Sequence, residues 1–290
     1  MATRVGPSSA LDTLDTFPKL LLHHARARGD RPAIREKDLG IWQTWTWKHL
    51  ADEVRALACG LAEQGLKRGD HLALVCDNRP RLYAMLCAAQ CLGAVPVTLY
   101  QDSAAAEMAF PIQNAEITHA LAEDQEQVDK LLEILPHCPT LKHIYYDDSR
   151  GMRHYKQSEL MSYEQLLALG HESFKRDPAF VETEIAKGSQ DDAAAMFFTS
   201  GTTGVPKGVV LTHLALIDRS RAAAEFEGLT DRDVVLAYLP PAWIGQNIFS
   251  YAQPFVAGYC IPGYSRTCSP RCRFAWRTRA RSSAGCTACS

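Results

Sequence analysis

The sequence has no long apolar run. No stretch approaches the ~18–20 consecutive apolar residues that a membrane-spanning helix needs, and the opening MATRVGPSSALDTLD lacks the apolar core of a signal peptide. Both absences make the cytoplasm the expected location. With 47% hydrophobic and 22% charged residues over 290 positions, the composition is that of a globular protein with room for one large domain or two ordinary ones.

Disulfides are not expected either, although the sequence contains ten cysteines. Six of them are scattered, and most of these lie in apolar segments, which is typical of reduced core thiols. These six are Cys59, Cys76, Cys87, Cys91, Cys138 and Cys260.

Two common nucleotide-binding fingerprints are also missing. The sequence contains no G-x-G-x-x-G, the Rossmann dinucleotide motif, and no G-x-x-x-x-G-K-[ST], the Walker A loop. Any nucleotide must therefore be held by a different kind of loop.

What the sequence does contain is a dense anion-binding segment, MFFTSGTTGVPKGVVLTH, from Met196 to His213. Glycines let backbone N–H groups approach an oxygen closely, Ser and Thr hydroxyls add donors, and a lysine adds a mobile positive charge. Pro206 removes one donor and stiffens the chain just before Lys207. The pattern predicts a loop that holds a phosphate chain, and the alternative is a Gly- and Thr-rich turn without a ligand.

Apolar strand patterns alternate with amphipathic helical patterns along the chain. Parallel strands need such crossover helices, so we predict an α/β fold with a doubly wound parallel layer over about residues 50–150. A second α/β unit is expected from Asp192, with strands at 193–198 and 233–240. We expect these two strands to lack later sheet partners, which leaves apolar faces and strand edges open.

Local signals predict several helix and turn positions. Pro18 and Pro80 occupy the first turns of predicted helices, and Ser162 with Gln165 forms a capping box at the start of another. Two short strands are predicted on either side of a turn at 38–40.

FTSGTTGVPKGVVLTH resembles the phosphate-binding signature of the adenylate-forming enzymes, which include acyl-CoA synthetases, peptide-synthetase adenylation domains and luciferases. The resemblance covers about residues 15–260. Its amino-terminal portion, from RPAIREKDLGIWQTWTW onward, is similar to bacterial long-chain fatty-acid–CoA ligases, and LAYLPPAWIGQNIFSYAQ is similar to a motif that lines the acyl pocket. The resemblance implies the doubly wound layers of the adenylate-forming large domain, incomplete here and without the carboxy-terminal small domain.

The resemblance also implies roles for single residues. Trp243 falls where a bulky ring bounds or gates the acyl tunnel in the family, and an ordinary core aromatic is the alternative for this residue. Thr199 and Gly208 would shape the ends of the loop. The residues implied to bind the phosphates of ATP are Thr199, Ser200, Gly201, Thr202, Thr203, Gly204 and Lys207.

The implied reaction has two steps. A fatty-acid carboxylate attacks the α-phosphorus of ATP to give an acyl-adenylate and pyrophosphate, and the thiolate of CoA then displaces AMP. The implied partners are a long-chain fatty acid, ATP with Mg²⁺, and CoA. Peripheral membrane contact is compatible with such a substrate, nucleic acid is not expected, and no oligomeric state is indicated. A ligase for aromatic or medium-chain acids is the alternative, because most tunnel-lining residues lie outside the resemblance.

Residues 261–290 are a different kind of sequence. They carry six Arg and no Lys, Asp or Glu, a charge of +6, whereas residues 1–260 carry 25 basic and 33 acidic residues, a charge of −8. Ile261 is their only branched aliphatic residue, so this tail is expected to be disordered. The tail contains a cysteine pattern that could indicate a zinc site and an arginine-rich pattern that could indicate a nucleic-acid-binding segment. We favour a frameshift near codon 261 over both, because a change of composition explains both patterns without a ligand. The residues behind these alternatives are Cys268, Cys272, Cys286 and Cys289 for zinc, and the arginines with Phe274 and Trp276 for nucleic acid.

Four segments are therefore expected. They are a flexible amino terminus over 1–14, a first α/β subdomain over 15–190, the start of a second subdomain with the phosphate loop over 191–260, and the tail over 261–290. The later family motifs that contact adenine and ribose, and the Arg that follows them near the domain hinge, are not found in the sequence. We accordingly expect the 290 residues by themselves to be a truncated, catalytically dead fragment that binds nucleotide weakly.

Overall fold

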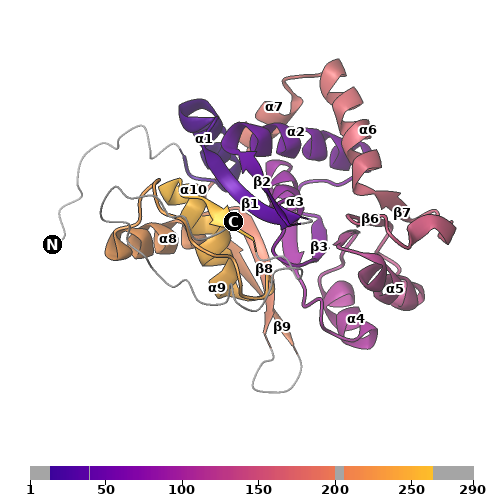
Figure 1. Ribbon diagram of the computed structural model, residues 1–290. Helices are drawn as coiled ribbons and strands as arrows, with labels where there is room; N and C mark the ends of the chain where they lie inside the picture. Colours follow the sequence, from indigo (N-terminus) through magenta and orange to yellow (C-terminus); the bar gives the residue numbers. More distant parts are fainter. Residues whose placement is uncertain (1–13, 39, 200–205, 264–290) are drawn as a thin grey trace.

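The fold is built on a central sheet with helices on both faces (Figure 1). The structure is a computed structural model, and it describes residues 14–38, 40–199 and 206–263. These residues form a seven-stranded sheet in the order β7-β6-β5-β3-β4-β8-β9, in which all neighbours are parallel except β8 and β9. The strands are β3 (His71–Val75), β4 (Val95–Thr98), β5 (His119–Ala122), β6 (His143–Tyr146), β7 (Leu160–Ser162), β8 (Ala193–Thr199) and β9 (Lys207–Thr212).

Successive residues of the central strands serve opposite faces of the sheet. In β3, Leu72 and Leu74 join one hydrophobic core, whereas Ala73 and Val75 join another. A strand that is covered on both faces must therefore be apolar at every position. The first core includes α1 (Phe17–Arg28), α2 (Trp47–Glu63), α3 (Pro80–Cys91), α6 (Tyr163–Arg176) and α7 (Phe180–Ala186), and the second includes α4 (Ala105–Asn114) and α5 (Gln125–Ile134). The predicted doubly wound parallel layer is confirmed.

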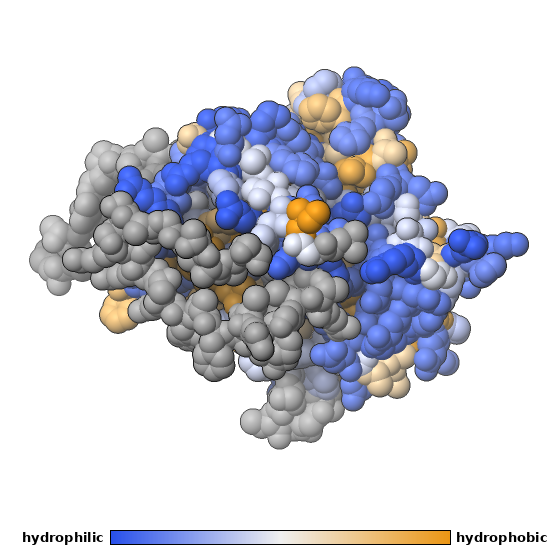
Figure 2. Space-filling model, in the orientation of Figure 1, coloured by the Kyte–Doolittle hydropathy of each residue, from blue (hydrophilic) through white to orange (hydrophobic). Residues whose placement is uncertain are grey.

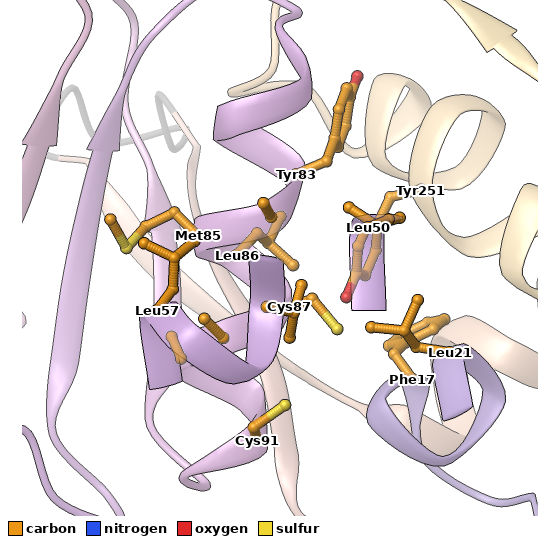
Figure 3. Packing of buried hydrophobic residues seen from close by; sticks show 14 of the residues in the cluster. Phe17, Leu21, Leu50, Leu57, Tyr83, Met85, Leu86, Cys87, Cys91 and Tyr251 are labelled. Carbon is orange, nitrogen blue, oxygen red and sulfur yellow. The ribbon is translucent and has the colours of Figure 1, made fainter. Parts of the chain in front are cut away.

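The first core brings α1, α2 and α3 together (Figure 3). Phe17 of α1 and Leu50 of α2 lie near Cys87 and Cys91, the thiols that α3 contributes to this packing. All six cysteines in the described part of the chain are buried and free, which confirms the prediction of reduced core thiols.

The local signals begin their elements at the expected positions. Pro18 and Pro80 lie in the first turns of α1 and α3. At the start of α6, the Ser162 hydroxyl accepts a hydrogen bond from the Gln165 N–H (3.1 Å), and the Gln165 side-chain oxygen accepts one from the Ser162 N–H (2.9 Å). The predicted hairpin is present as β1 (Pro32–Asp38) and β2 (Ile41–Thr46).

The carboxy-terminal part of the described chain packs back onto the amino-terminal part (Figure 1). β10 (Ile261–Pro262) pairs in parallel with β1, so that the described residues contain a second sheet in the order β10-β1-β2. The predicted tail therefore begins with two paired residues, and residues 264–290 lie outside the described ranges. The remaining elements are η1 (Leu135–His137), η2 (Met152–His154), α8 (His213–Glu227), α9 (Ile244–Asn247), the π-helical η3 (Ile248–Ala252) and α10 (Gln253–Ala257).

Two strand predictions need correction. The strand expected at 193–198 does not lack partners, because β8 pairs in parallel with β4 and antiparallel with β9. The prediction of a strand at 233–240 was wrong, since this segment makes only two isolated β-bridges, from Val234 and from Ala237. Pro240 and the following proline lack the N–H groups that a longer ladder needs. The subdomain boundary between residues 190 and 191 stays a prediction.

The described residues have an open strand edge with apolar side chains at β9, a strand for which no open edge was predicted. Val209 and Val210 are 42% and 49% exposed, and β8 is the only strand beside β9 within the described ranges. By contrast, the face drawn in Figure 2 is largely hydrophilic over α2 and around α5. None of the helices in the described part of the chain combines the length and the apolar character that a bilayer crossing requires.

Two glycines allow α2 and α6 to cross with their backbones in close contact. A Cβ built on Gly170 of α6 would lie 1.8 Å from the carbonyl oxygen of Ala56 in α2. One built on Gly60 of α2 would lie 2.5 Å from the carbonyl oxygen of Leu166 in α6. The contacting atoms are backbone, so a side chain at either position forces the helices apart.

We expect Gly170→Ala to lower the free energy of unfolding by about 3 kcal/mol, because overpacking a close helix contact displaces both helices. The measurement is urea unfolding followed by circular dichroism. The matched control is Gly245→Ala in α9, whose Cβ would meet its nearest atom, in Leu239, at an ordinary 3.7 Å and should change stability by no more than about 1 kcal/mol. Equal stability of the two variants would contradict the close-contact explanation.

Candidate functional site

The candidate phosphate loop connects β8 to β9. Thr199, the last residue of β8, lies opposite Lys207, the first residue of β9, in the antiparallel register. Both residues are exposed and therefore accessible to a ligand. Ser200, Gly201, Thr202, Thr203 and Gly204 lie outside the described residues, so their roles stay predictions.

Gly208 follows Lys207 at the described end of the loop. It pairs with Phe198, and a Cβ at this position would lie 3.1 Å from the sulfur of Met196 and 3.4 Å from the ring of Phe198. A side chain here would press on both neighbours, so glycine suits the start of β9.

The direction of β8 decides where the loop leaves the sheet. β8 runs parallel to β4, and β4 runs parallel to β3, so their carboxyl ends lie at the same edge. In open α/β sheets, ligands bind outside this edge, where the connections from adjacent strands leave on opposite faces. Here α3 follows β3 into the first core, and α4 follows β4 into the second. The two described ends of the loop, Thr199 and Lys207, therefore lie at the same edge of the sheet as this switch point.

A cleft of about 180 Å³ lies at the switch point. Asp77, just after β3, and residues 99–102, just after β4, form one wall, and residues 238–242 form the other. Tyr100 and Tyr238 are the exposed aromatic residues of these walls. Residues 238–242 lie within the stretch that resembles the acyl-pocket motif, whereas Asp77 and residues 99–102 were not predicted. The ends of two strands that connect to opposite faces were a signal that could have located them.

Trp243 comes directly after the second wall of the cleft. It precedes the first turn of α9 and is 48% exposed, whereas the packed indole of Trp47 is 1% exposed. Trp243 therefore differs from the packed core aromatics of the described residues. Its predicted role as a boundary for an acyl chain stays a prediction.

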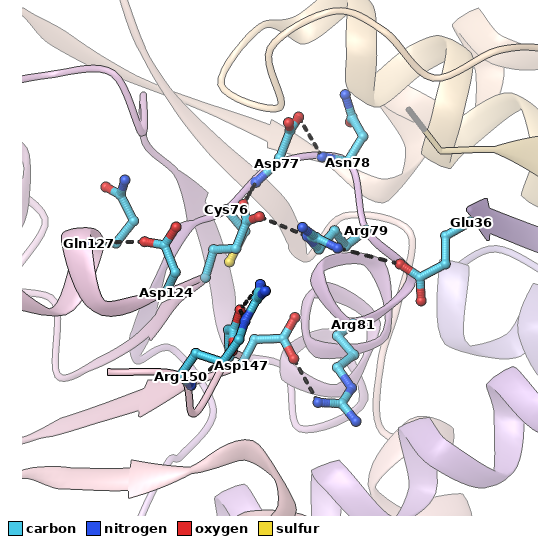
Figure 4. Close-up of polar contacts among 12 residues, drawn as sticks. Glu36, Cys76, Asp77, Asn78, Arg79, Arg81, Asp124, Gln127, Asp147 and Arg150 are labelled. Carbon is cyan, nitrogen blue, oxygen red and sulfur yellow. Dashed lines mark hydrogen bonds and ion pairs between the residues drawn. The ribbon is translucent and has the colours of Figure 1, made fainter. Parts of the chain in front are cut away.

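Beside the cleft, paired charges tie the ends of β3 and β5 together (Figure 4). Glu123, just after β5, is 7% exposed and accepts hydrogen bonds from the N–H of Asp77 (2.6 Å) and from Nε of Arg79 (2.7 Å). Arg79 also lies 3.7 Å from Glu36 of β1. A buried carboxylate needs such partners, because an unpaired charge is costly in the interior.

A second set of pairs holds the end of β6. Arg81 contacts Asp147, just after β6 (2.6 Å), and Glu164 of α6 (2.7 Å), and its guanidinium lies 4.5 Å from the centre of the Tyr163 ring. Burial raises the pKa of Asp147, and the positive charge of Arg81 opposes that rise. This mutual pairing supports a structural role, in which the charges fix the strand ends that border the cleft.

His213, the last residue of the signature segment, is a buried anchor. It is 3% exposed, and its Nδ1 accepts a hydrogen bond from the N–H of Phe17 at the start of α1 (3.3 Å). Burial lowers the pKa of His213 from 6.5 to about 4; the nearby Asp192 and Asp15 oppose the shift, and Lys19 adds to it. The neutral imidazole thus joins the end of β9 to the amino-terminal helix.

A sequence model of the AMP-binding enzyme family matches residues 21–287. The chain belongs to the AMP-binding enzyme family. The match includes both ends of the loop, the cleft and Trp243. It also continues through most of the tail, whose origin in a frameshift stays a prediction.

Curated relatives agree with this assignment to the family. The chain is 25% identical over 240 residues to the long-chain-fatty-acid–CoA ligase FadD15 of Mycobacterium bovis, an alignment that covers 82% of this chain and 38% of that protein. It is 29% identical over 214 residues to long chain acyl-CoA synthetase 3 of Arabidopsis thaliana, covering 72% of this chain and 31% of that protein. The chain thus spans well under half the length of these relatives.

Solved structures share the fold. A long-chain-fatty-acid-CoA ligase (FadD1) from Archaeoglobus fulgidus superposes with a TM-score of 0.72 at 18% identity, over 85% of this chain and 46% of that one. The anthranilate CoA ligase AuaEII, in complex with anthranoyl-AMP, superposes with a TM-score of 0.71 at 17% identity, over 85% and 44%. The mixed α/β fold is therefore that of the large domain of adenylate-forming enzymes, and the family is one of ligases.

We expect stability to fall between about pH 6.5 and pH 4, partly because the unfolded chain protonates His213 before the folded chain does. His213→Asn keeps an acceptor for the Phe17 N–H but cannot titrate. Over this interval, the slope of the unfolding free energy against pH should be smaller in the variant than in wild type by up to about 1.4 kcal/mol per pH unit. Urea unfolding at several pH values measures the slope, and His171→Asn at an exposed position is the control for loss of one imidazole. If the curves of unfolding free energy against pH are parallel for wild type and His213→Asn, protonation of His213 does not contribute to the loss of stability in acid.

Proposed function

We propose that this chain forms part of an acid–thiol ligase that activates a long-chain fatty acid with ATP and transfers the acyl group to CoA. One observation carries the proposal: in a chain of this family, the signature loop and the cleft lie at the same edge of the sheet. A phosphate chain at the loop and a carboxylate near the cleft would then be brought together for reaction.

The first step needs charge neutralisation and positioning more than covalent help from the protein. A carboxylate oxygen attacks the α-phosphorus of ATP, the bond to the β-phosphate oxygen breaks, and pyrophosphate leaves. Negative charge on the phosphates is offset by the Lys207 ammonium and by the donors predicted for Ser200 to Gly204. In the second step the CoA thiolate attacks the acyl carbonyl carbon, and AMP leaves with the bonding electron pair.

Mg²⁺ is expected to arrive with ATP. The described residues contain no group of three or more His, Cys, Asp or Glu side chains that could hold a metal ion. Mg²⁺ in nucleotide sites is bound largely by phosphates and water, so we assign it no protein ligands and derive no step through it.

The proposed preference for long acyl chains rests on Trp243. Its half-exposed indole follows the cleft wall directly, and a large rigid aromatic can bound an apolar chain at low entropic cost. The long-chain relatives named above support the same substrate class.

In the active form of the protein, Lys207→Ala should slow ATP–pyrophosphate exchange by about 10- to 100-fold, the loss expected for one hydrogen bond to a charged group. The fold should persist, because Lys207 is exposed at a strand end. Lys175→Ala removes another exposed lysine, from α6, and should leave the exchange unchanged. Wild-type exchange in Lys207→Ala would remove this residue from the mechanism.

We expect palmitate to give a higher kcat/KM than octanoate or benzoate in a CoA-ester assay with ATP, Mg²⁺ and CoA. The assay is run on the 290-residue chain and on any longer product of the same gene. Faster turnover of benzoate would favour the aromatic-acid alternative, and faster turnover of octanoate the medium-chain alternative. Palmitoyl-CoA made by the 290-residue chain above a no-enzyme control would exclude the catalytically dead fragment.

A further inference from the structure

The segment Leu239–Trp243, which contains most of the second wall of the cleft and Trp243 after it, is irregular backbone that buried side chains hold in place. Both hydrogen-bonding groups of Leu239 are bound by side chains from elsewhere in the fold. Its N–H donates to Oε1 of Gln246 in α9 (3.0 Å), and its carbonyl oxygen accepts from Nδ2 of Asn78 after β3 (2.8 Å). Two side chains thus hold the backbone of Leu239 by hydrogen bonds.

The side chains of Gln246 and Asn78 are also hydrogen-bonded to each other. Nε2 of Gln246 donates to Oδ1 of Asn78 (2.9 Å) and to the hydroxyl of Tyr83 in α3 (3.0 Å), and that hydroxyl donates to Oδ1 of Asn78 (2.7 Å). All three side chains are 2–3% exposed. The network therefore gives partners to both ends of the Gln246 and Asn78 amides without using a charged group, and removing one member leaves buried polar atoms without partners.

A third side-chain amide, that of Asn247, binds the backbone nearer to Trp243. Nδ2 of Asn247 donates to the carbonyl oxygens of Pro241 (2.6 Å) and Trp243 (3.1 Å). Pro240 and Pro241 have no N–H, so pairing as a sheet strand is not open to this segment. Side-chain amides take the place of the strand ladder.

The helix that supplies these amides changes its winding directly after them. The π-helical turn η3, Ile248–Ala252, follows Gln246 and Asn247. Such turns are rare and occur frequently at functional sites. Here the turn lies between a helical segment that holds the cleft wall and α10, which packs into the first core.

We propose that Gln246 is a positioning residue, which with Asn78 and Tyr83 fixes the segment Leu239–Trp243 and thereby the backbone that carries the Trp243 ring. The inference rests on the proposed function in one respect, that the ring bounds the acyl chain. The position of the ring itself does not depend on any substrate. Gln246 then acts on specificity through Trp243 and not by touching the reacting atoms.

The test labels the full 290-residue chain with 5-fluorotryptophan and records ¹⁹F NMR spectra. The sequence has five tryptophans, and Trp243→Phe identifies the signal of Trp243. Gln246→Met keeps the length of the side chain but removes its donors and acceptor, and we expect the Trp243 signal to shift or broaden. The signals of the buried Trp45 and Trp47 should stay in place and report an intact fold.

Gln253→Met is the matched control. Gln253 is also buried (0% exposed) and lies in α10, but its side-chain oxygen accepts from the Tyr259 hydroxyl (3.1 Å), away from the cleft wall. A Trp243 signal that is unchanged in Gln246→Met, or that moves equally in Gln253→Met, would overturn the proposal. Should Gln246→Met fail to fold, Tyr83→Phe removes one hydroxyl from the same network, and an unchanged Trp243 signal in that variant would overturn the proposal as well.

A kinetic readout separates this inference from the proposed function. In the active form of the protein, Gln246→Met should change the ratio of kcat/KM for palmitate over octanoate by about three- to tenfold, the effect of one lost hydrogen bond transmitted to the ring, with KM for ATP unchanged. If Trp243→Ala leaves the ratio as in wild type, the acyl-boundary role of Trp243 fails, and the NMR result still decides whether Gln246 positions the ring.

Discussion

The parallel pairing of β8 with β4 is the contact on which the candidate site depends. It adds the signature segment to a sheet whose other parallel strands are complete by residue 162, and it gives β8 the same direction as β3 and β4. Had β8 entered the sheet antiparallel, the loop would leave at the opposite edge, far from the switch point between α3 and α4. Strand direction therefore brings the segment predicted to bind phosphate and a cleft to one edge before any side chain takes part.

Two different kinds of interaction hold the backbone around the cleft. The ends of β3, β5 and β6 are fixed by charged pairs such as Glu123 with Arg79, which keep carboxylates partnered in a partly buried setting. The wall opposite is fixed by uncharged amides and a phenol, which carry directional hydrogen bonds without a buried charge. The strand side of the cleft is thus held by electrostatic attraction, and the proline-rich side by hydrogen-bond geometry.

The parts that the sequence predicted correctly depend on neighbours in the chain. Pro80, and Ser162 with Gln165, act within one helical turn, and the alternation of strands and helices needs only local patterns. The parts that were missed depend on distant partners. Asn78 and Gln246 are 168 residues apart, and nothing in the sequence around either one indicates the other. The partner of β8 is likewise about a hundred residues earlier, because three strands of the sheet and four α-helices come between. Trp243 was recognised through resemblance alone, since exposure beside a cleft has no local pattern.

The pairing of β1 with β10 has a consequence for how the chain is made. Ile34 lies opposite Ile261, and the N–H of Phe17 is bound by a residue 196 positions later. On the ribosome, the first helix and the first strand emerge about 200 residues before the residues that complete them. One edge of β1 therefore stays without its partner until residue 261 has been made, and contacts of such high sequence separation form slowly. The beginning of this chain therefore completes its packing only after residues 213 and 261 have been made, and a chaperone that shields new chains would meet it unpaired.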